Sequence, residues 1–234
     1  MRNILTVFFL TLSVQLFWGQ TIDNFVNNKI EVNSLNVPID IKQPYFPREM
    51  FPEIETNIIK EKNSSYRIET KIISGSYDEF VVNWYSSHLH AMKEPLLFNR
   101  KITKEIYRFT WLRTFHKPIC IRFEKDNDNY AITWKMLSGE GGYDPGKLLL
   151  NKSKKLTEKE WDLFKTYLKT SNFWQMELGR NSMGTDGAEW ILEGVTPEQY
   201  RVVTVWSPEK GDFYNVCNYL ISLTDLQISN REKY

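Results

Sequence analysis

Two short segments of alternating side chains constrain the fold of this chain more than any other part of its sequence. Residues 119–125 (ICIRFEK) and 130–136 (YAITWKM) flank the turn-forming residues 126–129 (DNDN). If Lys125 pairs with Tyr130, one register of a β-hairpin puts all the large apolar side chains on one face. That face holds Ile119, Ile121, Phe123, Ile132, Trp134 and Met136, and the opposite face includes Cys120, Arg122 and Lys135.

A third strand is expected just before this hairpin. Residues 106–115 (IYRFTWLRTF) are joined to it by 116–118 (HKP). A tight turn there pairs Arg113 with Cys120 and Trp111 with Arg122, which places aromatic and cationic side chains on the more polar face. Such a face is either covered by a helix, the commoner arrangement, or binds a ligand. The candidate ligand-binding residues are Trp111, Arg113, Arg122, Lys135 and, in the glycine-rich loop 138–146, Tyr143.

A second hairpin is expected near the C-terminus. Residues 188–194 (AEWILEG) and 200–206 (YRVVTVW) alternate around a five-residue turn. Pairing Gly194 with Tyr200 places Glu193 opposite Arg201, as a cross-strand ion pair on a solvated face.

Three helices complete the predicted elements. Their apolar spacing places them over residues 77–93, from a capping box at Thr157–Glu160, and over 213–226. Because the strands come in hairpins, we expect one α+β domain with a mostly antiparallel sheet of two or more hairpins packed by about three helices. The domain spans residues 61–230, and a Pro- and Asn-rich, irregular lead-in spans residues 21–60.

The first twenty residues predict export. Arg2 precedes a mainly apolar run from Ile4 to Trp18. As a helix this run spans about 22 Å, less than the roughly 30 Å of a bilayer core. Residues 1–20 therefore fit a cleaved signal peptide, which leaves a periplasmic or secreted protein with no integral membrane span. The large side chains of Phe17 and Trp18 near the cleavage site leave an uncleaved N-terminal anchor as the alternative.

The balance of acidic and basic residues indicates which classes of partner the protein can bind. The chain has 30 Lys and Arg and 29 Asp and Glu, and removal of Arg2 with the signal leaves 29 of each. A neutral protein lacks the basic excess that nucleic acid or an anionic membrane requires. The expected partner is a protein or a small-molecule ligand.

The two cysteines suggest a link between distant elements. In an exported protein, Cys120 and Cys217 are expected to form a disulfide. That bond docks the last helix over Trp111 and covers the aromatic face. The alternative is two buried free thiols in different places.

Few residues are candidates for catalysis. Asp186, Glu193 and His116 are the polar groups we would test, and no G-x-S-x-G elbow occurs. His88 and His90 lie two apart on a predicted helix and point in different directions, so no metal site is expected. The loop 138–146 lacks the Gly-Lys-Ser/Thr ending of a phosphate cradle, so no cofactor is expected.

The string YRFTWLRTFHKPICIRF, with EPLLF before it and DGAEWILEG…YRVVTVWSP after it, resembles a recurring group of exported bacterial proteins of the Bacteroidota type. The resemblance covers residues 80–225, about two thirds of the chain. It implies a single structural unit, and it brings no activity or catalytic residue with it.

These features favour an exported binding or interaction protein of unknown ligand. The alternative is a secreted hydrolase that acts on envelope or carbohydrate material, and a third possibility is a structural subunit or inhibitor of a secreted enzyme. A hydrolase requires two acids, or an acid and His116, within about 10 Å in one pocket. A binding protein requires an aromatic-lined or flat surface.

Overall fold

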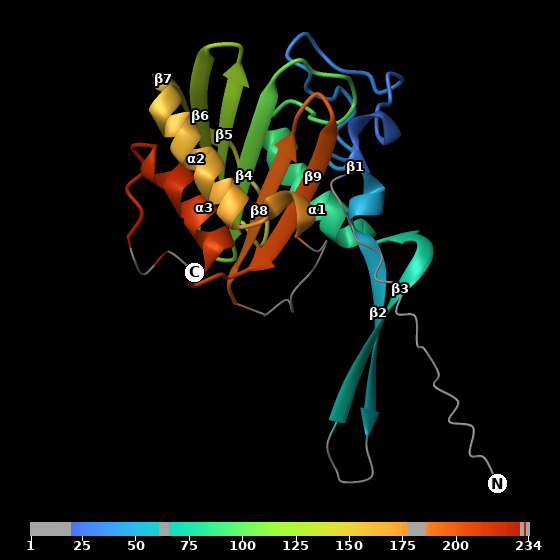
Figure 1. Ribbon diagram of the computed structural model, residues 1–234. Helices are drawn as coiled ribbons and strands as arrows, with labels where there is room; N and C mark the ends of the chain where they lie inside the picture. Colours follow the sequence, from blue (N-terminus) through green and yellow to red (C-terminus); the bar gives the residue numbers. More distant parts are fainter. Residues whose placement is uncertain (1–19, 61–65, 177–185, 230–231, 233–234) are drawn as a thin grey trace, which may run out of the picture.

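The described part of the protein combines one large antiparallel sheet, a projecting hairpin and three α-helices (Figure 1). The computed structural model describes residues 20–60, 66–176, 186–229 and 232, so residues 1–19 of the predicted signal peptide lie outside the described part. The predicted α+β class is confirmed.

The main sheet has seven strands, and all neighbouring strands run antiparallel. Their order across the sheet is β1-β9-β8-β4-β5-β6-β7. The bounds are β1 Gln20–Thr21, β4 Glu105–Arg113, β5 Ile119–Asp126, β6 Asn129–Leu137, β7 Leu148–Leu156, β8 Ala188–Val195 and β9 Gln199–Trp206.

The sheet is the middle of three layers, as Figure 1 shows. One face packs against α2 (Glu158–Thr170), α3 (Asp212–Ser222) and the short 3₁₀ helix Phe173–Gln175. The other face packs against α1 (Glu79–Ala91) and the lead-in, which contains the 3₁₀ turns Ile22–Asn24 and Arg48–Met50. Each face has its own apolar core, so the central strands are buried on both sides and carry few solvent-facing positions.

Helix α2 begins at the predicted capping box. The Thr157 hydroxyl accepts a hydrogen bond from the Glu160 amide at 3.3 Å, and the Glu160 carboxylate accepts one from the Thr157 amide at 2.7 Å. These two bonds satisfy amide groups that the first helical turn leaves without partners. The helix then buries Trp161, Phe164 and Leu168 against the sheet.

The central hairpin forms in the predicted register. Ile121 lies opposite Trp134, and Lys125 lies opposite Tyr130. The apolar face of β5 and β6 packs under α2 and α3. The register is well determined because a slip of one residue would move all of these side chains to the opposite face of the sheet, where Lys135 and Cys120 are buried.

The predicted register between β4 and β5 is wrong by three residues. Thr110, not Arg113, lies opposite Cys120, and Trp111 lies opposite Ile119. The connection is wider than a tight turn, because the Arg113 carbonyl accepts hydrogen bonds from the amides of His116 and Gly141. An odd error reverses the faces, so Trp111 lies with the apolar side chains and not beside Arg122.

The predicted register of the C-terminal hairpin is wrong by one residue. Val195, not Gly194, lies opposite Tyr200, and the Thr196 amide bonds to the Gln199 carbonyl to close a shorter turn. The shift again reverses the faces. Glu193 and Arg201 therefore lie on opposite sides of the sheet, and the predicted ion pair between them does not form.

The lead-in differs from the irregular chain predicted for residues 21–60. Its first part is irregular but packed, with Tyr45 and Phe46 buried in the core beside α1. Its last part forms strand β2 (Pro52–Lys60), which pairs with β3 (Tyr66–Tyr77) in a separate hairpin. We call this hairpin the arm, because Figure 1 shows it extending away from the body of the molecule. The predicted domain boundary at residue 61 falls between the two strands of the arm.

The predicted disulfide is wrong. Cys120 and Cys217 are both free and buried. Cys120 points into the core shared with α1, whereas Cys217 lies on α3 in the core on the opposite face. The sheet separates the two sulfur atoms, so no bond can join them without unfolding.

We predict that both cysteines are inert in the folded protein. Burial raises the pKa of the Cys120 thiol to about 12 and raises that of Cys217 well above its ordinary value, and the thiolate is the reactive form. Native protein treated with iodoacetamide should gain no label, and unreduced protein in guanidinium should gain two. An unreduced mass two hydrogens lighter, with no labelling after unfolding, would show that the cysteines are bonded.

Candidate functional site

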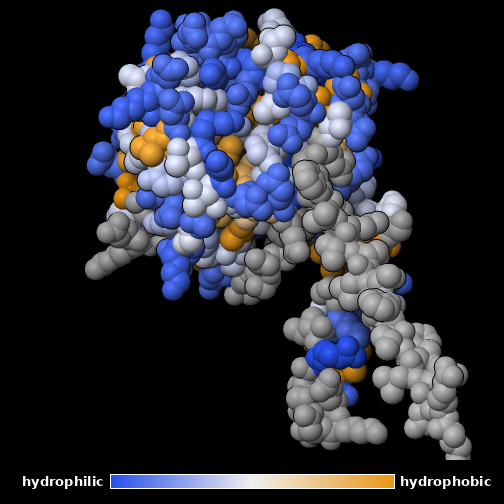
Figure 2. Space-filling model, in the orientation of Figure 1, coloured by the Kyte–Doolittle hydropathy of each residue, from blue (hydrophilic) through white to orange (hydrophobic). Residues whose placement is uncertain are grey.

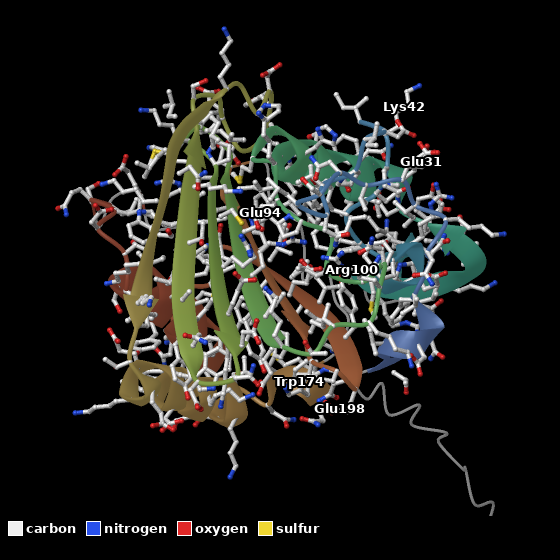
Figure 3. The ribbon with its side chains drawn as sticks, turned by 90° about the horizontal axis from the view of Figure 1, so that it is seen from above. Glu31, Lys42, Glu94, Arg100, Trp174 and Glu198 are labelled. Atoms are coloured by element: carbon white, nitrogen blue, oxygen red, sulfur yellow. The ribbon has the colours of Figure 1, made fainter. Side chains whose placement is uncertain are left out.

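A buried ionic cluster lies between the sheet and α1. Glu94, which follows α1, is surrounded by three cations from adjacent strands, and Figure 3 places it against the sheet within the fold. Its carboxylate oxygens lie 2.7 Å from Lys135 Nζ, 2.9 Å from Arg122 Nε and 3.8 Å from Arg108 Nη1. The cations converge because the observed register puts Arg108 opposite Arg122, on the face that α1 covers.

The end of α1 holds Glu94 in this position. The helix ends at Ala91, and Lys93 adopts a left-handed backbone with φ 53° that turns the chain back over the sheet. Lys135 Nζ donates hydrogen bonds to the carbonyls of Met92 and Lys93 at 2.9 and 3.1 Å. A cation at a helix C-terminus satisfies exposed carbonyls and matches the helix dipole.

A second buried acid completes the cluster. Glu193 accepts a hydrogen bond from Arg108 Nε at 2.8 Å and another from the Tyr200 hydroxyl at 2.6 Å. Arg108 also donates to the Pro95 carbonyl at 2.7 Å. Glu193 is therefore fully engaged by its neighbours, although the sequence marked it as a catalytic candidate.

The two acids respond differently to their surroundings. Burial alone raises the pKa of Glu94, but the charges of Arg122, Lys135 and Arg108 together outweigh burial and lower it. Burial also raises the pKa of Glu193, and here Arg108 and the Tyr200 hydroxyl offset the increase only in part. The difference follows from the number of cations, three around Glu94 against one beside Glu193.

The cluster is structural. Glu94 and Glu193 are each 1% exposed and Arg108 is 0% exposed, so a substrate has no access to their charges. The predicted ligand residues Arg122 and Lys135 form ion pairs with Glu94 instead of facing a ligand. Their charges bind α1 and the segment after it to the sheet.

The other predicted ligand residues do not join them. Trp111 is fully buried on the opposite face, where the Arg113 guanidinium lies 4.6 Å from its ring centre and donates to the Lys117 carbonyl. Tyr143 lies exposed in the loop after β6, with its ring centre 6.3 Å from that of Phe115. The predicted aromatic and cationic patch is wrong, because the register error had merged two faces.

The catalytic candidates do not converge. His116 lines a surface cavity of about 360 Å³, and its Nε2 lies 3.8 Å from the Glu232 carboxylate. Asp186 precedes β8, and Glu193 lies seven residues further along the chain. At about 3.3 Å per residue, some 23 Å of chain separates them. The pocket expected of a hydrolase with Asp186, Glu193 and His116 is therefore not formed.

Among the described residues, neither a three-ligand metal group nor a membrane-spanning helix is found. Within residues 20–60, 66–176, 186–229 and 232, no group of three His, Cys, Asp or Glu side chains is placed to hold a metal ion. In the same ranges, no helix has the length and apolar character needed to cross a membrane.

The arm presents an apolar face to solvent. Ile54, Ile58 and Ile72 are 37%, 70% and 54% exposed. Ile54 lies directly opposite Ile72, and Ile58 follows four residues after Ile54, so the three share one face of the ribbon. Lys60 ends the same face at the tip, and Figure 2 shows hydrophobic and hydrophilic side chains together on the arm.

The opposite face of the arm is mainly charged, although it also carries Ile59, which is 37% exposed. Glu55 lies opposite Lys71, Asn57 lies opposite Glu69, and Arg67 forms an ion pair with Glu69 at 2.6 Å. The arm is thus an amphipathic ribbon. Its charged face is compatible with exposure to solvent. In the described part of the chain, no helix packs on its isoleucine face as helices pack on the main sheet.

The base of the arm contains an acidic cavity. Its volume is about 590 Å³, and its lining includes Ile54 and the carboxylates of Glu53, Asp78 and Glu79. Phe80 also lines it and is 69% exposed. The cavity therefore continues the isoleucine face to the body of the protein. We take this face and cavity together as the candidate functional site.

No signal in the sequence marked this site in advance. The prolines near β2 suggested irregular chain, so the sequence pattern did not indicate a strand that pairs with residues 66–77. A search for the alternation I-E-T-N-I in β2 would have found the strand but not its exposure.

Comparisons with known proteins give little guidance. No family model matches the chain. It is 28% identical over 97 residues to ATP synthase subunit a of Acanthamoeba castellanii. The match covers 39% of this chain and 39% of that protein, so the chain spans well under half the length of this relative.

We predict that Glu94→Gln destabilises the protein by about 3–5 kcal/mol at pH 7, because it removes the carboxylate paired with buried Lys135. It also leaves Arg108 and Arg122 with one acid each, Glu193 and Glu124. The folded pKa of Glu94 lies below its unfolded value of about 4.3, so Glu94 stabilises the wild type above that pH and loses this effect as the pH falls through the folded pKa. The glutamine side chain of the variant does not ionise, so the variant lacks this stabilisation at every pH. The stability difference should therefore narrow below about pH 4.3 in urea titrations.

Glu31→Gln is the matched control, because Glu31 is exposed and away from the cluster. Its unfolding free energy should change by less than about 0.5 kcal/mol. A loss of similar size in both variants would contradict a specific role for the buried carboxylate.

Proposed function

We propose that this protein is an exported binding protein that acts in the periplasm or outside the cell and docks on a partner protein through the arm. The observation that carries the proposal is the exposed face of Ile54, Ile58 and Ile72. A structural subunit or an inhibitor of a secreted enzyme would use the same surface.

Energetics support a docked state for the arm. A two-stranded hairpin alone is at best marginally stable in water. Full burial of one isoleucine side chain is worth about 1.5–3 kcal/mol, so covering a face with three of them is a substantial gain. The fold of the body does not require these residues to be apolar, since none of them packs in either core.

The backbone of the arm offers a second means of attachment. In the described part of the chain, β2 and β3 pair only with each other, so each has an outer edge that faces no other strand. An unpaired edge can accept a strand from another protein through main-chain hydrogen bonds. Docking through the apolar face and pairing through an edge are compatible.

The alternative function is a secreted hydrolase acting on envelope or carbohydrate material. One observation favours it, the approach of His116 to Glu232 beside a surface cavity. It is weaker because Glu193 is buried in ion pairs and Asp186 lies at the other end of β8. The partial similarity to ATP synthase subunit a supports neither function.

We predict that the arm contacts another protein in the native compartment. A photo-reactive benzoylphenylalanine at Thr56, on the isoleucine face, should give a cross-linked product of higher mass after irradiation of intact cells. Adding Ile58→Asp should reduce the yield at least tenfold, because a charge on this face opposes its burial.

The matched control places the same probe at Asn57, on the charged face, where the yield should be lower than at Thr56. Circular dichroism should show that every variant is folded. If neither position gives a product in the compartment where the protein accumulates, the proposed function is wrong.

A further inference from the structure

The isoleucine face of the arm is self-complementary in charge. Its base adjoins a cavity lined by the acidic residues Glu53, Asp78 and Glu79, and its tip carries the exposed Lys60. Asp78 also caps α1 through the Val81 amide, and Glu53 accepts a hydrogen bond from the Ser76 hydroxyl. Within the described part of the chain, Glu79 is therefore the acid of this cavity that no hydrogen bond engages. Ile54 and Ile58 lie between these two ends, with Thr56 in the middle. One end is therefore acidic, the centre is apolar, and the other end is basic.

We propose that the partner of the arm is a second copy of this chain, bound face to face by a two-fold axis so that Lys60 of each copy enters the acidic cavity of the other. This inference rests on the proposed function, because it takes the arm as the docking element. An isologous contact requires a surface complementary to itself, and an acidic–apolar–basic strip meets that requirement when the two strips run antiparallel.

The spacing along β2 agrees with this arrangement. A two-fold axis at the level of Asn57 places Lys60 of one copy at the level of Ile54 of the other, and Ile54 lines the cavity. The six residue steps from Ile54 to Lys60 span about 20 Å at 3.3 Å per residue. The same axis places Thr56 level with Ile58 of the second copy, so each central isoleucine meets the methyl group of a threonine.

The small contact area of the arm determines how stable the proposed dimer is expected to be. A strip about 20 Å long and 10 Å wide is smaller than the roughly 800 Å² that each partner buries in a standard stable interface. The dimer is therefore expected to be reversible and to depend on concentration. The net charge of the chain is only +1, so two copies can approach with little net repulsion.

Charge reversal tests the contact in solution. In sedimentation over a range of protein concentrations, wild type should show a monomer–dimer equilibrium, and Lys60→Glu should weaken the dimer at least tenfold. Adding Glu79→Lys to Lys60→Glu restores an opposite pair across the axis and should recover most of the association. Lys71→Glu makes the same charge change on the other face and should leave the dimer unchanged.

Cysteine pairing tests the register. Because both native cysteines are buried, thiols placed on the arm should react selectively. A mixture of the Thr56→Cys and Ile58→Cys proteins should form a disulfide-linked dimer under mild oxidation, faster than a mixture of Thr56→Cys and Asn57→Cys. Equal rates in the two mixtures would overturn the proposed two-fold arrangement.

The outcomes separate this inference from the proposed function. A protein that remains monomeric at every concentration, while the probe at Thr56 still gives a product in cells whose mass is not twice that of the chain, overturns the self-association alone. A monomer with no cellular product overturns both. A dimer that Lys60→Glu and Ile58→Asp leave intact uses another surface and also overturns the inference.

Discussion

The ion pairs of Glu94 connect the layer that contains α1 to the main sheet. The carboxylate comes from the segment after α1, whereas its cations come from β4, β5 and β6, so a single buried group joins the helical layer to three strands. Burying such charges is costly unless each is paired, and the cluster meets this condition through Glu193, Tyr200 and the carbonyls at the end of α1. The position of α1 fixes the end of β3, and hence the base of the arm.

The central hairpin was predictable because its alternation and its short turn allow only one register. The neighbouring pairs were not, because a wider connection after β4 and a shorter turn after β8 each shifted the register by an odd number. An odd shift exchanges the two faces of a strand. This single kind of error produced the false aromatic and cationic patch around Trp111 and the false Glu193–Arg201 pair, whereas the disulfide was expected from the predicted export and the presence of two cysteines.

The sequence pattern identified two cations of the buried ionic cluster but not the acid that pairs with them. Arg122 and Lys135 were recognised as cations on one face, but Glu94 lies in a loop whose approach to the sheet depends on where α1 ends. Local pattern contains no such information, because the contact joins residues 28 and 41 positions apart. Arg108 was likewise assigned to no role, although its guanidinium joins both buried acids.

The arm escaped prediction for a different reason. Sequence patterns reveal strands by the core that they cover, and β2 covers no core of this chain. Its isoleucines are explained neither by the packing of the body nor by solubility, which would favour polar side chains at all exposed positions of the ribbon. The proposed docking of the arm on a partner would account for its amphipathic character. Since its acidic base and basic tip match each other, the simplest surface with the required chemistry is the arm of another copy.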